Sequence, residues 1–301
     1  MASPSTARPS SARLSAAAGR APPISLKGWA RIGVRATGIV GILVPAVALH
    51  YLWRTLRLSS PWPRLFLGLT GWIVGAQVQR TGRPVRRNVV FISNHVSWID
   101  ILIIAGASGS AFVAKAEIRA APVVGWLSTL NRTVFVARED RTGVSEQIAR
   151  LREALTDVWS VTIFPEGTTD DGRSLLPFKS ALLKILEPPP PEIVVQPLML
   201  DYGMIGPELS WLGMESGQDN ALRVLARPGR FRVGIRFLDP FSPSEFVGRK
   251  AIAAEARIRI AAALSVVLGR PVETFIGHEA WSSGAVDTLH ETGSASPLGA
   301  L

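Results

Sequence analysis

The amino-acid sequence predicts an α/β protein, with a mixed β-sheet flanked by helices and an N-terminal membrane-associated helical pair. Short β-branched and aromatic runs alternate with helical stretches along residues 81–270. The chain has 301 residues, 47% of them hydrophobic, which is enough for one sizeable α/β domain with flanking pieces. Two apolar segments precede this domain, and they account for the expected helical pair.

The N-terminal third carries only positive charge. Asp100 is the first carboxylate, so every Lys and Arg before it is uncompensated, and the whole chain has a formal charge of +10. These arginines flank apolar segments instead of forming a base-stacking surface, which favours anionic membrane lipid as a partner and argues against nucleic acid. Residues 1–26 are rich in Ser, Ala, Pro and Arg and lack periodicity, so we expect a disordered basic N-terminus.

Residues 27–80 are expected to anchor the chain to a membrane. Residues 37–53 are almost uninterrupted apolar sequence, close to the minimum of about 17 residues that cross a bilayer, and residues 65–78 form a shorter apolar run. The first segment is expected to cross the bilayer or to lie deep in one leaflet, and the second to lie at the interface. Helices of a soluble core are the alternative.

The domain at residues 81–270 contains the predicted strands and two clear helices. The strands are expected near residues 88–93, 111–114, 133–136, 161–164, 193–200 and 231–237, and the helices at 144–158 and 244–268. Loops at the carboxyl ends of such strands meet on one edge of the sheet, where a site is expected. Residues 271–301 are small and polar and are expected to form a loosely ordered tail.

A histidine and an aspartate follow the first of these strands. His95 and Asp100 stand directly after the apolar run at 89–92. Imidazole has an ordinary pKa near neutrality, and a carboxylate bonded to one ring nitrogen leaves the other nitrogen free to accept a proton. Taken alone, such a pair is more often a satisfied hydrogen bond at a helix start than a catalytic pair. The chain has no cysteine and no Gly-x-Ser-x-Gly elbow, so the nucleophile is expected to come from the substrate.

A second strand also ends in polar, turn-forming residues, and two further strand-like runs accompany it. The run at 161–164 stops at Pro165-Glu166-Gly167-Thr168, a stretch that alone would be an ordinary turn. A strand-like run at 131–138 has arginines at both ends, and the run at 193–198 contains Pro197. The site is therefore expected to draw on several strand ends.

Together these segments resemble the glycerolipid acyltransferase family typified by bacterial 1-acyl-glycerol-3-phosphate acyltransferases. The four family blocks occur in order, at His95 with Asp100, at 135–138, at 164–168, and at Val195 with Pro197. The blocks cover about residues 85–200, and the similarity extends to about residue 270. The resemblance implies the glycerol-3-phosphate acyltransferase-like fold for the α/β domain.

The resemblance also implies roles for residues. His95 would act as general base on the free hydroxyl of a lysolipid, and Asp100 would orient it. The hydroxyl would attack the thioester of acyl carrier protein or coenzyme A, a co-substrate that makes a cofactor or metal unnecessary. Arg138 would hold the phosphate or equivalent anion of the acceptor. The acceptor pocket would include Asn94, Glu166, Gly167 and Thr168.

The sequence departs from the family pattern after Thr168. Members that act on phosphatidic-acid precursors usually carry arginine at the next position, where this chain has Thr169. Arg173 or Lys179 could supply the missing cation, and both are candidate substrate-binding residues. The arrangement also resembles the branch that acylates lyso-ornithine lipid, whose ammonium could suit the Asp170–Asp171 pair.

We therefore expect an O-acyltransferase of a bacterial inner membrane, with the catalytic domain facing the cytoplasm. The expected reaction converts 1-acyl-sn-glycerol-3-phosphate to phosphatidic acid in phospholipid biosynthesis, and formation of ornithine lipid is the alternative. A non-catalytic lipid-binding protein and a hydrolase are the competing classes. The segment from Trp211 to residue 220 is expected to be a polar surface loop, or to border the acceptor site.

Overall fold

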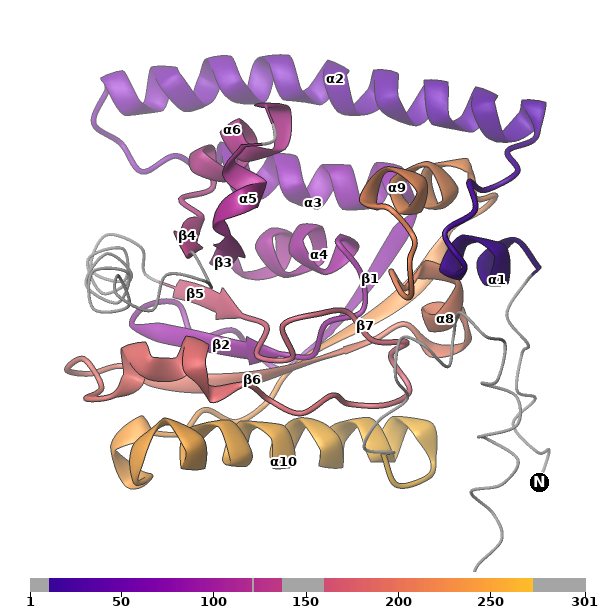
Figure 1. Ribbon diagram of the computed structural model, residues 1–301. Coiled ribbons are helices and arrows are strands. Elements are labelled where there is room, and N and C mark those ends of the chain that lie inside the picture. The colour runs from indigo at the N-terminus through magenta and orange to yellow at the C-terminus, as the bar shows by residue number, and fades with distance from the viewer. Residues whose placement is uncertain (1–10, 121, 137–159, 273–301) are drawn as a thin grey trace, which may run out of the picture.

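The computed structural model describes residues 11–120, 122–136 and 160–272, and a seven-stranded sheet with helices on both faces forms the centre of this part (Figure 1). The strands are β1 (Ala76–Thr81), β2 (Val89–Ser93), β3 (Ala111–Lys115), β4 (Val134–Val136), β5 (Ser160–Ile163), β6 (Val194–Asp201) and β7 (Phe231–Phe237). Their spatial order is β1-β7-β6-β2-β5-β3-β4. The predicted α/β class is therefore confirmed.

The sheet is mixed, as predicted, because β7 runs antiparallel to β6. The strands from β6 through β2 and β5 to β3 and β4 are parallel, and β1 pairs parallel with β7 at the edge. Every residue of β2 is buried, as expected for a central strand with both faces covered. The carboxyl end of this strand opens directly onto the loop that carries His95.

One face of the sheet is covered by α10 (Gly248–Leu268), which lies below it in Figure 1. Ile252, Ala256, Ile260 and Leu264 recur at helical spacing along α10, and all four are buried in the core beneath the sheet. The short helices η1 (Ser180–Leu186) and η3 (Pro243–Glu245) precede it in the chain, and η1 packs against it. The predicted helix at 244–268 is thus present, shortened at its N-terminus.

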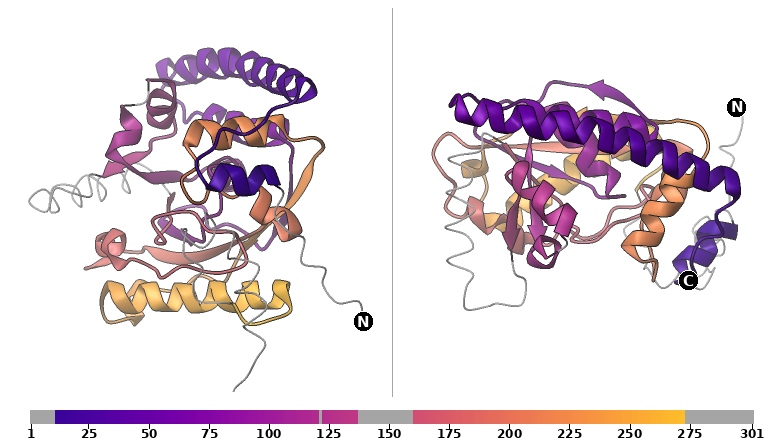
Figure 2. Two further views of the ribbon diagram at one scale, coloured as in Figure 1. Left: turned by 45° about the vertical axis from the view of Figure 1, so that its right-hand side comes forward. Right: turned by 90° about the horizontal axis from the view of Figure 1, so that it is seen from above.

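The other face is covered by α3 (Trp62–Val74) and α4 (Ile99–Ser108). Their backbones approach closely at Gly68 and Gly106, where a Cβ added to Gly106 would lie 2.7 Å from the Gly68 Cα. Outside them, α2 (Leu26–Thr55) runs across the molecule and also contacts α9 (Gly217–Ala226), as Figure 2 shows from above. Smaller helices complete this side, namely α5 (Ala116–Arg119), α6 (Pro122–Leu130), η2 (Gly203–Ile205) and α8 (Gly206–Leu209).

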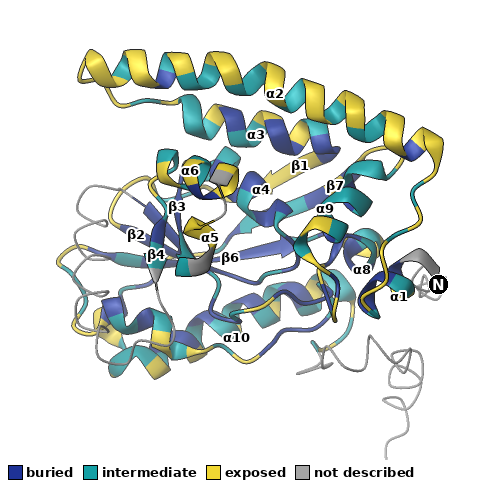
Figure 3. Cartoon of the chain, turned by 45° about the horizontal axis from the view of Figure 1, so that its top comes forward, coloured by how far each residue is buried: buried dark blue, intermediate teal, exposed yellow. Residues whose placement is uncertain are grey.

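The outermost helix is long and apolar. Ser25 caps the N-terminus of α2, because its Oγ accepts the Gly28 N–H at 3.1 Å. The helix has 30 residues, and its most apolar window has a mean hydropathy of 2.0. No residue of that window is buried, and Figure 3 shows α2 mainly as exposed or half-exposed surface. By length and composition the helix could cross a membrane. The predicted N-terminal pair corresponds to α2 and α3.

Two expectations about the N-terminal part need correction. Within the segment expected to be disordered, Ser11–Ala17 form α1, because Arg13, Ala16 and Ala17 are buried against other parts of the chain. The boundary expected at residue 80 falls inside β1, whose residues Ala76–Thr81 pair with β7. The helix expected at 144–158 lies outside the described residues, as does the expected tail from residue 273 onward.

Candidate active site

His95 and Asp100 are in direct contact at the carboxyl end of β2. His95 Nδ1 lies 2.8 Å from Asp100 Oδ2, and the same oxygen accepts the backbone N–H groups of Val96 at 2.7 Å and Ser97 at 3.0 Å. An oxygen that receives two N–H groups is an acceptor, so Nδ1 carries the hydrogen of the third bond. The neutral imidazole therefore has its lone pair on Nε2, where it can accept a proton.

A third residue completes the carboxylate's hydrogen bonds. The Tyr202 hydroxyl, from the residue directly after β6, donates to Asp100 Oδ1 at 2.5 Å. Burial, followed by the nearby Asp100 charge, raises the pKa of Tyr202 well above its usual value, so the hydroxyl keeps its proton and remains a donor. Sequence reasoning missed Tyr202, since only the adjacency of β2 and β6 brings it to the site.

Glu166 links the strand-end loops at His95 and at residues 164–179. Its Oε1 accepts the His95 backbone N–H at 2.7 Å and its Oε2 accepts the Leu176 N–H at 3.0 Å. The Asp170 N–H donates to the His95 carbonyl at 2.7 Å, so both backbone groups of His95 are held by the second loop. Burial, followed by the Asp170 charge, raises the pKa of Glu166 well above its usual value.

The His95 ring packs against an aromatic side chain and remains partly exposed. It stacks on Phe164 with ring centroids 4.1 Å apart and an interplanar angle of 18°. Its side chain keeps 19% exposure, whereas the Asp100 side chain is fully buried. The site thus presents a base with a fixed tautomer and an accessible ring.

Asp170 and Asp171 point inward. Asp170 accepts the Asp171 N–H and the Ser174 hydroxyl, each at 2.6 Å, and Asp171 accepts the Arg173 N–H at 2.8 Å. They are only 4% and 1% exposed. The suggestion that this pair meets an ammonium headgroup is therefore not supported.

The buried Asp170 predicts a pH effect on stability. Burial, followed by Asp171, raises its pKa from 3.8 to about 7, so the folded state holds this proton while the unfolded chain has lost it. The free energy of unfolding should fall as pH rises from about 4 to about 7, by at most about 1.4 kcal/mol per pH unit for this group. Urea denaturation should show a shallower pH slope for Asp170→Asn than for the wild type. An unchanged slope in that variant, or a shallower one in the exposed control Asp239→Asn, would contradict this assignment.

The other predicted site residues are more scattered. The Asn94 side chain is buried and bonded to the Leu200 backbone through both its oxygen and its nitrogen, at 2.8 and 3.0 Å. The Asn94 side chain therefore fixes the end of β2 to β6. Gly167 has φ +74° in the turn after Phe164, and Thr168 beside it is exposed.

The candidate cations do not join the His95 cluster. The guanidinium of Arg173 lies 3.8 Å from the Met204 sulfur, and Lys179 is exposed. Within the described ranges, neither side chain bonds to His95, Asp100 or Glu166. Arg138, the predicted anion-binding residue, lies outside the described residues.

An apolar pocket of about 430 Å³ begins at the same loops. The pocket lies between α2, α3, α6 and α9. It is also lined by Trp98, which lies between His95 and Asp100 in the chain. Other lining residues include Leu43, Phe66, Leu127 and Trp211. A volume of this kind suits a hydrocarbon chain.

The structure also corrects the prediction for the segment that follows α8. Glu215 and Asn220 are buried, although a polar surface loop was expected there. Trp211 is partly exposed and lines the pocket. The burial follows from the ion pair of Glu215 with Arg223, which the sequence did not indicate.

A histidine held by a buried carboxylate thus lies near an apolar pocket, an arrangement that allows proton transfer beside a hydrocarbon-containing substrate. A family model described as Acyltransferase matches residues 76–201. A lyso-ornithine lipid O-acyltransferase of Brucella abortus is 30% identical over 81% of this chain and 98% of its own length. The chain belongs to this acyltransferase family and is an acyltransferase.

Two further comparisons concern phosphate-containing lipids. A 1-acyl-sn-glycerol-3-phosphate acyltransferase of Neisseria gonorrhoeae is 36% identical over 37% of this chain and 44% of its own. The crystal structure of the 1-acyl-sn-glycerophosphate acyltransferase of Thermotoga maritima superimposes with a TM-score of 0.58 at 20% identity, over 82% of this chain and 97% of that one. The latter similarity establishes the fold.

Proposed function

We propose that the chain transfers a fatty acyl group from acyl carrier protein or coenzyme A to the free hydroxyl of a lysolipid at a membrane surface. The contact between His95 Nδ1 and Asp100 Oδ2 carries this proposal, because it leaves Nε2 as the proton acceptor. The apolar pocket supports a hydrocarbon chain as part of the substrate. No cofactor or metal is needed, because a thioester is already activated.

The reaction proceeds in two proton movements. His95 Nε2 takes the proton of the lysolipid hydroxyl while the oxygen attacks the thioester carbonyl carbon. The C–S bond then breaks, the new ester forms, and the departing thiolate receives the proton from the imidazolium. Asp100 stabilises the imidazolium charge between these steps, and the loop bonds of Glu166 keep the His95 backbone in place.

Two acceptors have support. The phosphate-containing 1-acyl-sn-glycerol-3-phosphate is favoured by the Neisseria relative and would give phosphatidic acid. Lyso-ornithine lipid has the more extensive support, since the Brucella relative matches over nearly its whole length. In addition, Thr169 occupies the position of the usual arginine, is buried, and donates its hydroxyl hydrogen to the Trp211 carbonyl.

One assay separates the acceptors. The purified full-length protein in detergent or vesicles is offered radiolabelled palmitoyl thioester with lysophosphatidic acid and lyso-ornithine lipid in parallel. We expect label in an ester of at least one lysolipid, and the preferred lipid identifies the acceptor class. Label released only as free fatty acid would instead favour a hydrolase and overturn the proposal.

The proposed location is a bacterial inner membrane with the catalytic domain on the cytoplasmic side. α2 lies on the side of the molecule opposite α10 (Figure 1), and its residues Val34, Val40 and Val44 are exposed. The arginines of the N-terminal third suit anionic lipid. Trp72 on α3 is 54% exposed and carries Arg230 over its ring at 4.1 Å, a pairing suited to an interface.

Charges on α2 should weaken membrane attachment. Val40→Lys with Val44→Lys places two ammonium groups on the exposed apolar face, each costing up to about 3 kcal/mol in hydrocarbon. Flotation of full-length protein with vesicles should fall at least about tenfold. The matched control is Ile258→Lys with Val266→Lys, two comparably exposed residues of α10, which should float like the wild type. Equal flotation of both pairs would contradict an anchor at α2.

A further inference from the structure

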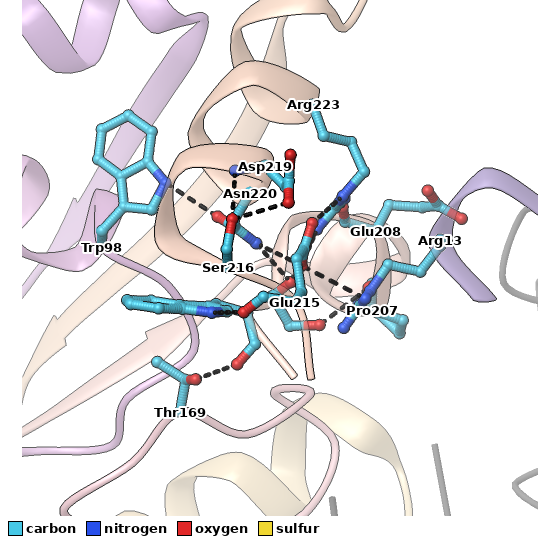
Figure 4. A network of polar contacts seen from close by, with 12 residues as sticks. Arg13, Trp98, Thr169, Pro207, Glu208, Glu215, Ser216, Asp219, Asn220 and Arg223 are labelled. Carbon is cyan, nitrogen blue, oxygen red and sulfur yellow. Dashed lines mark hydrogen bonds and ion pairs between the residues drawn. The ribbon is translucent and has the colours of Figure 1, made fainter. Parts of the chain in front are cut away.

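A buried carboxylate outside the catalytic cluster is held by two arginines. Glu215 Oε1 and Oε2 accept from Arg223 Nε and Nη2 at 2.7 and 3.0 Å, a bidentate ion pair, and Oε2 lies 3.5 Å from Arg13 Nη1 (Figure 4). The side chains of Arg13 and Glu215 are fully buried. Such an arrangement is costly to disrupt, because removal of one partner leaves uncompensated charge in the interior.

Arg13 brings α1 into this network from the far end of the chain. Its Nε donates to the Pro207 carbonyl at 3.0 Å, and the Met214 N–H donates to the Ala17 carbonyl at 2.9 Å. Gly213 makes this approach possible, since it has φ +67° and an added Cβ would lie 2.4 Å from the Ala17 oxygen. α1 is thus fixed to the segment that carries Glu215.

On its other side, Glu215 orients two tryptophans. Its Oε2 accepts from Asn220 Nδ2 at 2.9 Å, and Asn220 Oδ1 accepts the indole N–H of Trp98 at 3.0 Å. The backbone carbonyl of Glu215 accepts the indole N–H of Trp211 at 2.7 Å. Both indoles line the apolar pocket.

The same tryptophans belong to the loops of the catalytic cluster. Trp98 lies between His95 and Asp100 in the chain, and the backbone N–H of Trp211 donates to the Val96 carbonyl at 3.3 Å. The Trp211 carbonyl accepts from the Thr169 hydroxyl in the second loop. The pocket wall and the catalytic loops are therefore joined by one hydrogen-bond network.

We propose that Glu215, held by Arg13 and Arg223, is a positioning residue that sets the acyl-chain selectivity of the enzyme through the Trp98 and Trp211 indoles. This inference rests on the proposed function, because it requires that the pocket receives the chain of a substrate. Because Arg13 lies on α1, this helix would also contribute to acyl-chain selectivity. A polar network suits this role better than apolar packing, since its hydrogen bonds fix the direction of each indole.

The test measures the ratio of kcat/KM for palmitoyl-CoA to that for lauroyl-CoA in acyl transfer by the full-length protein. This ratio is independent of the fraction of folded enzyme, so loss of stability alone does not move it. Glu215→Gln and Arg13→Met should each change the ratio by about tenfold, because pocket contacts discriminate about tenfold or more per methylene. The control Arg20→Met, at an exposed arginine of the same N-terminal segment, should keep the wild-type ratio.

A milder substitution tests the inference if Glu215→Gln and Arg13→Met do not fold. Arg13→Lys retains the charge but cannot donate to Pro207 and Glu215 with the geometry of a guanidinium, so a shift of about threefold is expected. Wild-type ratios in all folded network variants would overturn the inference while leaving the proposed function intact. Absence of acyl transfer to either lysolipid by the wild type would instead overturn both.

Discussion

Replacing His95 with alanine is expected to lower the rate of acyl transfer by on the order of 10² to 10⁴-fold, the contribution of a positioned general base. The reason is that Nε2 is the ring nitrogen left to accept the hydroxyl proton in the proposed reaction, and no other histidine lies in the His95–Asp100–Glu166 cluster as the structure describes it. The measurement is incorporation of labelled acyl groups into the lysolipid under saturating donor.

Added imidazole distinguishes loss of the base from loss of the fold. The alanine variant leaves space next to Phe164, where free imidazole can bind and accept the proton, so partial recovery of activity is expected. Vesicle flotation should match the wild type, because α2 is untouched. Wild-type turnover by the His95→Ala protein would dismiss the assigned base.

The second large effect is expected for Asp100. In Asp100→Asn the amide oxygen can still accept from His95, Val96 and Ser97, but the negative charge that stabilises the imidazolium is gone. We expect kcat to fall by about 10² to 10⁴-fold, as for loss of the orienting carboxylate in other base–carboxylate sites. Steady-state kinetics with both substrates saturating measure it.

Tyr202→Phe should have a smaller effect on kcat than Asp100→Asn. It removes only the hydroxyl that donates to Asp100 Oδ1, so a smaller loss of about tenfold in kcat is expected with little change in KM. A Tyr202→Phe protein more impaired than Asp100→Asn would mean that the carboxylate is not the group through which Tyr202 acts.

The sequence predicted the central strands well, because a strand that is buried on both faces shows this in its own run of apolar residues. β2 is a continuous β-branched and aromatic run, which is what a strand covered on both faces requires. β1 was missed because Gln77, Gln79 and Arg80 give it no apolar alternation, and all but its first residue are exposed. Such an edge strand is defined by its pairing with β7, which lies far along the chain.

The same distinction applies to the site. His95, Asp100 and Glu166 could be predicted because they occur in short, ordered motifs at strand ends, and the structure brings all three together. The contacts of α1 could not be predicted, because the partners of Arg13, Pro207 and Glu215, lie 194 and 202 residues away in the chain. An arginine in a segment rich in Ser, Ala and Pro gives no local sign of burial.

The supporting bonds explain why a site built on loops can be well ordered. Glu166 and Asp170 hold both backbone groups of His95, and Asn94 fixes the end of β2 to β6. The base is therefore set by the sheet on one side and by the second strand-end loop on the other. In the proposed reaction we expect such positioning to supply a large part of the rate enhancement that a single base cannot supply.

A rapid-quench experiment tests most directly whether the acceptor hydroxyl itself attacks the thioester. Enzyme is mixed with stoichiometric labelled palmitoyl thioester, with and without lysolipid, and free thiol, lipid ester and protein-bound label are followed over one turnover. We predict no burst of thiol and no labelled protein without lysolipid, and equal rates of thiol release and ester formation when it is present. A burst of thiol with label attached to the protein in the absence of lysolipid would contradict direct transfer assisted by His95.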